Sequence, residues 1–85
     1  MSKKDQRTLD ALFAKRIDGS IEWKAVEALF RGLGADIAEK KGSGIDVTLN
    51  HIDAVFHRPH PRRECGRSLV KRVREFLARA GVEHD

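Results

Sequence analysis

The chain has 85 residues, with 17 lysines or arginines against 13 acidic residues and a formal net charge of +4. A domain of this size buries only about 60% of the surface of its unfolded chain, which leaves little interior to enclose a metabolite or a large cofactor. The single Cys65 excludes an internal disulfide and a four-cysteine metal site. We therefore expect no cofactor, and any chemistry must act at an exposed face on a substrate such as a polymer.

The sequence also bears on location. No apolar run is long enough to span a membrane, and no apolar signal region follows Met1–Asp5. We therefore expect a cytoplasmic protein with no membrane association.

The positive charge is concentrated in one segment. Residues 57–79 contain eight basic and two acidic residues, a net charge of +6, whereas the rest of the chain carries −2. A localised positive charge is typical of a surface that binds phosphate groups. A solvated helix face would have the same composition, but the histidines at positions 57 and 60 favour a nucleic-acid surface.

The first part of the chain predicts two helices. Leu9, Leu12 and Phe13 follow helical spacing and predict a helix over residues 5–15. Residues 18–20 then break it, and Ser20 is a suitable N-cap for a second helix. The second helix should end at residues 32–34, where glycine can adopt the left-handed closing conformation.

Three strands and a last helix follow. Residues 36–39, 45–49 and 54–58 are predicted strands, and the turns between them are too short for parallel pairing. Ser68 should cap a helix over residues 68–80, which Gly81 closes. The sequence thus predicts a two-layer α+β domain with one open sheet face. The predicted core consists of Trp23, Val26, Phe30, Leu33, Val47, Phe56, Val73, Phe76 and Leu77.

Several motifs, taken in order, resemble the HicA family of bacterial toxins: Glu22–Phe30, Leu33–Ala35, Lys41–Ser43 and the helix Val70–Gly81. The resemblance covers roughly residues 21–82 and rests on the order of these motifs. It implies a double-stranded-RNA-binding-domain-like α-β-β-β-α core over residues 21–85. Residues 1–20 would form an N-terminal extension with an extra short helix. The resemblance also implies an endoribonuclease toxin that binds and cleaves mRNA, neutralised by a HicB-type antitoxin that covers the active face.

The chain departs from the family at one position. HicA proteins typically carry a histidine, regarded as catalytic, directly after the Gly-Ser of the turn, and in this chain that position is Gly44. The catalytic role therefore cannot be carried over to residue 44. Either another histidine performs it, or this protein binds RNA without cutting it.

His57 and His60 are the candidates to replace the missing histidine. Metal-independent RNA cleavage needs a base for the 2′-OH proton, a cation for the charged phosphorane and an acid for the leaving oxygen. His57, Arg58 and His60 supply these groups. A polyproline-like conformation would place both imidazoles on one edge, about 9 Å apart along its axis, whereas a strand would point them to opposite faces. The sequence does not decide between these, and two merely exposed histidines at a proline-rigidified strand exit are an equally good interpretation.

The remaining candidates are cations that bind phosphate. We expect RNA contacts from Lys40, Lys41, Arg58, Arg62, Arg63, Lys71 and Arg74. His57, His60 and Cys65 match no standard zinc spacing, so we expect no metal site. His51, in a turn, and His84, in the tail, should be exposed to solvent. Two alternatives to a toxin remain open: a non-catalytic RNA-binding module of the same fold, and a protein-interaction domain whose basic helix meets an acidic partner.

Overall fold

The computed structural model describes residues 1–84 and has the predicted order of elements. The elements are α1 (Lys3–Leu12), α2 (Trp23–Gly32), β1 (Asp36–Glu39), β2 (Gly44–Leu49), β3 (Ile52–His57) and α3 (Arg67–Arg79). The strands form one antiparallel sheet in the order β1-β2-β3. This confirms an α+β domain with an α-β-β-β-α core and an additional N-terminal helix.

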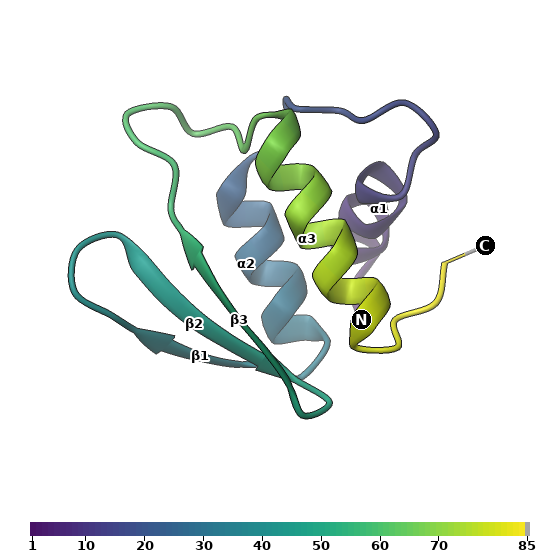
Figure 1. Cartoon of the computed structure of the whole chain (residues 1–85). Coiled ribbons are helices and arrows are strands. Elements are labelled where there is room, and N and C mark those ends of the chain that lie inside the picture. The colour runs from purple at the N-terminus through teal and green to yellow at the C-terminus, as the bar shows by residue number, and fades with distance from the viewer. Residues whose placement is uncertain (85) are drawn as a thin grey trace.

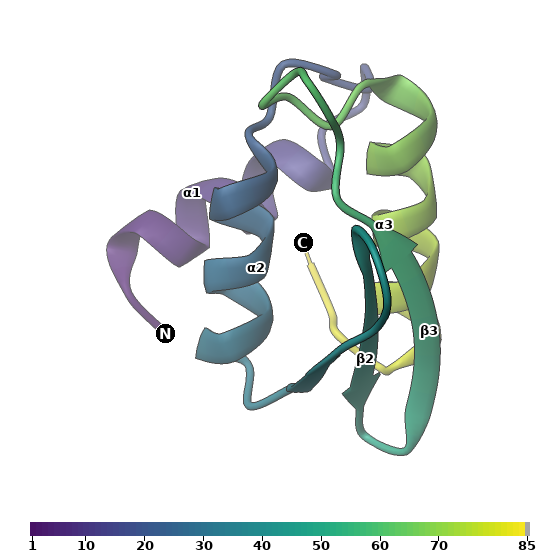
Figure 2. The ribbon, with the colours of Figure 1, turned by 90° about the vertical axis from the view of Figure 1, so that its left-hand side faces the viewer.

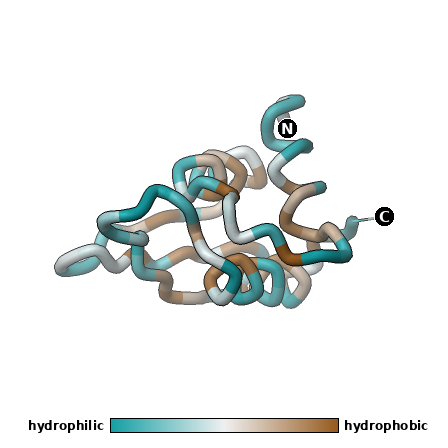
Figure 3. The backbone as a smooth tube through the Cα atoms, turned by 90° about the horizontal axis from the view of Figure 1, so that it is seen from above, coloured by the Kyte–Doolittle hydropathy of each residue, from teal (hydrophilic) through white to brown (hydrophobic). Residues whose placement is uncertain are grey.

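The elements form layers (Figure 1). The sheet lies on the left of the view, α2 and α3 cross the middle, and α1 lies on the right. Figure 2 shows α1 and the strands on opposite sides of α2. In Figure 3 the loops that project at the left are coloured mainly as hydrophilic. The core lies between the sheet and the α2–α3 pair, because β2 turns Ile45, Val47 and Leu49 towards these helices.

Aromatic rings occupy the centre of this core. Phe30 of α2, Phe56 of β3 and Phe76 of α3 meet pairwise, with ring centroids 5.6–5.8 Å apart. Trp23 lies 6.0 Å from Phe56 by the same measure. Every predicted core residue is buried except Leu33, which is half-buried because it is the C-cap residue of α2.

Two predicted helix starts are wrong. The carboxylate of Asp18 accepts a hydrogen bond from the Ser20 backbone at 2.9 Å, so Ser20 belongs to the preceding turn, and the N-cap of α2 is Glu22. Similarly, the N-cap of α3 is Gly66 instead of Ser68. The late start of α2 results from hydrogen bonds between the loop that precedes α2 and the loop that precedes α3. The ends of α2 and α3 agree with the prediction, since Gly34 and Gly81 have φ values of 86° and 84°. The first helix, however, spans Lys3–Leu12 instead of the predicted residues 5–15.

The loops that lead into α2 and α3 are held to each other. The backbone N–H of Cys65 donates to the Ile21 carbonyl at 2.8 Å, and that of Trp23 donates to the Arg63 carbonyl at 2.9 Å. These bonds keep residues 21–22 extended, so that α2 cannot begin before Trp23. The two loops meet at the top of Figure 1.

Arg74 and the C-terminal tail fasten α1 to the domain. The Arg74 guanidinium donates to the carbonyls of Leu12 and Ala14, both at 2.6 Å, and thereby satisfies the C-terminal end of α1. The ring of His84 stacks on Phe13 with centroids 5.3 Å apart, and its Nε2 lies 2.8 Å from an Asp10 carboxylate oxygen. His84 is therefore largely buried, contrary to the prediction from sequence. His51 is exposed, as predicted.

Candidate functional site

His57 lies directly opposite Gly44 in the β2–β3 pair. The next pair, Ile45 and Phe56, points into the core, so Gly44 and His57 belong to the open face of the sheet. A Cβ atom added at Gly44 would lie 3.5 Å from His57 Cε1 and 3.6 Å from Nδ1. The imidazole of His57 thus lies beside the place that a side chain at residue 44 would occupy.

Lys40 also lies beside the space that a side chain at residue 44 would occupy. Its backbone N–H donates to the Gly44 carbonyl at 2.9 Å, and its Cβ would be 3.5 Å from a Cβ added at Gly44. On the other side of the turn, the Arg58 N–H donates to the Ser43 carbonyl at 2.9 Å. The turn between β1 and β2 therefore brings a lysine and an imidazole together at one end of the open face, with Lys41 exposed beside them.

Two carboxylates lie next to this end of the open face, since Asp46 is the next residue after Gly44 on the same face of β2. Asp46 and Asp53 lie close enough to share a hydrogen bond, which raises the pKa of Asp46 and lowers that of Asp53. Thr48 Oγ1 also donates to Asp53, at 2.8 Å. Lys40 lies close enough to lower the pKa of both carboxyl groups, so its charge partly offsets the repulsion that the two carboxylates exert on phosphate.

Arg58 is held internally by two carboxylates. Its guanidinium contacts Glu27 of α2 at 2.7 Å and Glu39 of β1 at 2.7 and 2.8 Å. Hydrogen bonds from Arg58 lower the pKa of both carboxyl groups, and the two carboxylates raise the pKa of Arg58. Arg58 was predicted to bind RNA phosphate, but its fork-shaped donors are occupied in the structure. It joins α2, β1 and the end of β3.

Glu27 was missed by the sequence analysis, although the sequence contains a signal for it. It lies four residues after Trp23, on the side of the helix that is otherwise apolar. The structure buries Glu27, and its carboxylate accepts a hydrogen bond from Trp23 Nε1 as well as from Arg58. A carboxylate on an apolar helix face requires such partners, so its position predicts a buried cation nearby.

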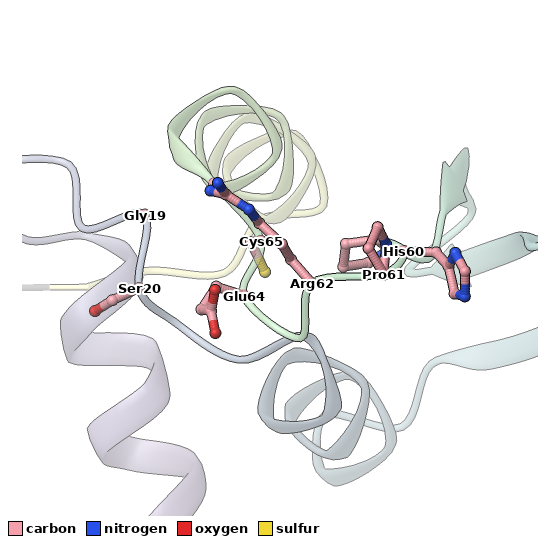
Figure 4. A pocket seen from close by; sticks show the side chains of 9 residues that line it. Gly19, Ser20, His60, Pro61, Arg62, Glu64 and Cys65 are labelled. Carbon is pink, nitrogen blue, oxygen red and sulfur yellow. The ribbon is translucent and has the colours of Figure 1, made fainter.

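His60 lies in different surroundings from His57. It lines a cavity of about 680 Å³ together with Gly19, Ser20 and Cys65. Figure 4 shows its ring at the end of the loop far from Cys65, turned away from the centre of the cavity. Burial raises the pKa of the Cys65 thiol to about 11. The chain leaves β3 after His57, so His57 and His60 do not lie on opposite faces of one strand.

The other predicted RNA contacts fall into two groups. Arg62, Arg63 and Lys71 are exposed and form no ion pair with a carboxylate within residues 1–84. Arg74 instead donates to the end of α1 and lies over Phe13, 5.8 Å from the ring centroid. The basic segment therefore contains both free cations and cations that hold the fold together.

A comparison with models of known protein families assigns the chain to a family. The model of the HicA toxin of bacterial toxin–antitoxin systems matches residues 23–82. The chain belongs to the HicA toxin family. The matched region begins at the first residue of α2, so α1 lies outside it, and it includes both Gly44 and His57.

Two further comparisons found nothing: no curated protein and no solved structure matches this HicA chain.

Within residues 1–84, no helix has the length and apolar character needed to cross a bilayer. The same residues contain no group of three or more His, Cys, Asp or Glu side chains placed to hold a metal ion.

Proposed function

We propose that this HicA toxin binds mRNA in the cytoplasm and cleaves it as a metal-independent endoribonuclease. A HicB-type antitoxin would neutralise it by covering the active face. The proposal is carried by the contact between His57 and Gly44. The family histidine is missing at residue 44, but an imidazole lies across the strand pair beside the same place. Residues 1–20 form an extension that braces α2 and α3 from behind the 21–85 domain.

The chemistry follows from the groups at this end of the sheet. Neutral His57 takes the proton of a ribose 2′-OH, whose oxygen attacks the adjacent phosphorus. Lys40 stabilises the added negative charge on the phosphorane. The bond to the 5′-oxygen then breaks, and that oxygen receives a proton from an acid, for which His60 is the candidate. The products are a 2′,3′-cyclic phosphate and a free 5′-hydroxyl.

The exposed cations supply the RNA surface. Lys40, Lys41, Arg62, Arg63 and Lys71 are available to contact the phosphate backbone. Arg58 and Arg74 are excluded from this set because their donors are engaged inside the protein. Contacts of this kind bind RNA with little dependence on base sequence.

The test is cleavage of a labelled mRNA by the purified toxin in the presence of a chelator. We expect cleavage by the wild type with cyclic-phosphate ends, and none by His57→Ala. His51→Ala is the matched control, since His51 is another exposed histidine far along the sheet. Circular dichroism should show both variants folded. Wild-type cleavage by a folded His57→Ala protein would exclude His57 as the base.

A second candidate function is supported by the same departure. If His57 does not replace the family histidine, the protein is an RNA-binding module without catalysis. The wild type would then bind RNA in a salt-dependent manner, leave it intact and leave cell growth unchanged on induction. Binding to an acidic protein, without salt-dependent binding to RNA, would indicate the protein-interaction domain instead.

A further inference from the structure

A small hollow lies between the first turn of α2 and the loop that follows β3. Its volume is about 260 Å³, which is below the range of about 300–1,000 Å³ typical of pockets that enclose drug-sized ligands. The hollow can therefore take a single flat ring rather than a larger ligand. Its apolar walls are formed by Pro59, Pro61 and the exposed edge of the largely buried Trp23. The charged lining consists of the cations Lys24, Arg58, Arg62 and Arg63 and one carboxylate, that of Glu22.

The hollow is built from parts that are fixed in place. Its two sides are tied by the hydrogen bond from the Trp23 N–H to the Arg63 carbonyl at 2.9 Å. Arg58, in the wall, is held by Glu27 at 2.7 Å and by Glu39 at 2.7 Å. A ligand that enters would not have to order these groups, so little affinity is lost to reorganisation.

The charge at the rim favours an anion. Arg62 and Arg63 are exposed, and within residues 1–84 neither forms an ion pair with a carboxylate. Lys24 is paired with Glu22 at 3.8 Å, and both side chains are largely exposed, so this pair is weak. The ligand that fits apolar walls and a cationic rim is a flat ring that carries phosphate.

We propose that this hollow binds one unpaired nucleobase of the RNA, with the flanking phosphates on Arg62 and Arg63. The inference rests on the proposed function, because Arg58 in the wall directly follows His57 in the chain. A base in the hollow would thus hold the strand beside the proposed catalytic imidazole. Paired bases are stacked inside a duplex and cannot enter, so the toxin would select single-stranded segments.

Trp23 provides a direct measurement, because it is the only tryptophan of the chain. The probe is a hexameric RNA with 2′-O-methyl riboses, which cannot be cleaved through the 2′-oxygen. It is titrated into the full-length protein as a single strand and as a duplex of the same sequence. We expect the single strand to change Trp23 fluorescence and to bind on the order of tenfold more tightly, since contacts to one base are worth about that factor.

Two charge-matched double variants distinguish binding of a base in the hollow from general electrostatic attraction between the protein and RNA. Arg62→Ala with Arg63→Ala removes the rim, whereas Arg67→Ala with Lys71→Ala removes two exposed charges from α3. We expect the first to lose the preference for single strands and the second to weaken both forms equally. Both variants are checked for folding by circular dichroism.

The outcomes distinguish the two proposals. A duplex that binds as tightly as the single strand, or binding that leaves Trp23 fluorescence unchanged, would overturn the base-binding hollow and leave the proposed function standing. Failure of the wild type to bind either form would overturn both. A preference for single strands without any cleavage of natural RNA would support the hollow and contradict the catalytic function.

Discussion

Gly44 and His57 are direct partners across the β2–β3 pair, and the imidazole of His57 lies beside the place that a Cβ atom at residue 44 would occupy. A larger side chain at residue 44 would compete with His57 for the same side of the sheet. The absence of a side chain at residue 44 and the presence of a histidine at residue 57 are therefore spatially related. This relationship can be tested by exchanging the two positions.

We expect His57→Ala to abolish RNA cleavage and toxicity, and the double variant Gly44→His with His57→Ala to recover part of both. The alanine at residue 57 leaves room for an imidazole at residue 44, which would project from the same end of the open face. The measurement is the rate of RNA cleavage, with growth on induction as a second readout. Recovery should be absent when glutamine replaces histidine at residue 44. An inactive but folded double variant would show that the two positions are not equivalent.

Removing Arg62, Arg63 and Lys71 together should weaken RNA binding and flatten its salt dependence. Each phosphate contact to single-stranded RNA contributes about −0.7 to the slope of log K against log salt, so the loss of three contacts should reduce the slope by about 2. The measurement is a binding titration over a series of salt concentrations. An unchanged slope would show that RNA binds to another face of the protein.

Arg74 and Lys71 should behave differently although both are cations of α3. Arg74→Met removes two hydrogen bonds that a charged group donates to the end of α1, and we expect a loss of about 1–3 kcal/mol in the free energy of unfolding. Lys71→Met should leave stability nearly unchanged and weaken RNA binding. Urea denaturation and RNA titration of both variants check this. Equal stability of the two variants would show that α1 is held without Arg74.

Phe76→Ala should strongly destabilise the domain. Phe76 is buried and its ring contacts both Phe30 and Phe56 at the centre of the core. Truncation of such a residue costs about 3–5 kcal/mol, a large part of the roughly 5–10 kcal/mol available to a small domain. Thermal unfolding followed by circular dichroism measures the change. A midpoint close to that of the wild type would contradict the central position of α3.

The Glu27–Arg58 contact should make stability depend on pH. Arg58 lowers the pKa of Glu27 in the folded protein below its ordinary value of 4.5. The unfolded state therefore binds the proton first, and the contact stabilises the fold fully above about pH 4.5 and progressively less as pH falls through the lowered pKa. Arg58→Met should reduce stability at pH 7 and flatten the loss on acidification. Denaturation at pH 7 and pH 3 measures both, and Arg31→Met, beside the same carboxylate, is the milder control.

The local patterns of the chain were sufficient to predict which helices and strands form and in what order, but not where the helices begin. Helical spacing around Val26 and Phe30, alternation around Val47 and the closing glycines depend only on neighbours in sequence, and the structure confirms them. The motifs typical of the family also occur in the expected order along the chain, and this order allowed the HicA fold to be predicted. The concentration of charge in residues 57–79 was likewise visible, because charge can be counted without knowing the fold.

The roles of individual charged residues were decided only by tertiary structure. Arg58 and Arg62 look alike in sequence, yet one is enclosed by carboxylates from α2 and β1 while the other faces solvent. Arg74 similarly meets carbonyl groups some 60 residues earlier in the chain. Strand register, in turn, placed His57 opposite Gly44. Each of these facts depends on contacts between distant segments, and only folding brings the partners of a cation or an imidazole within a few ångströms.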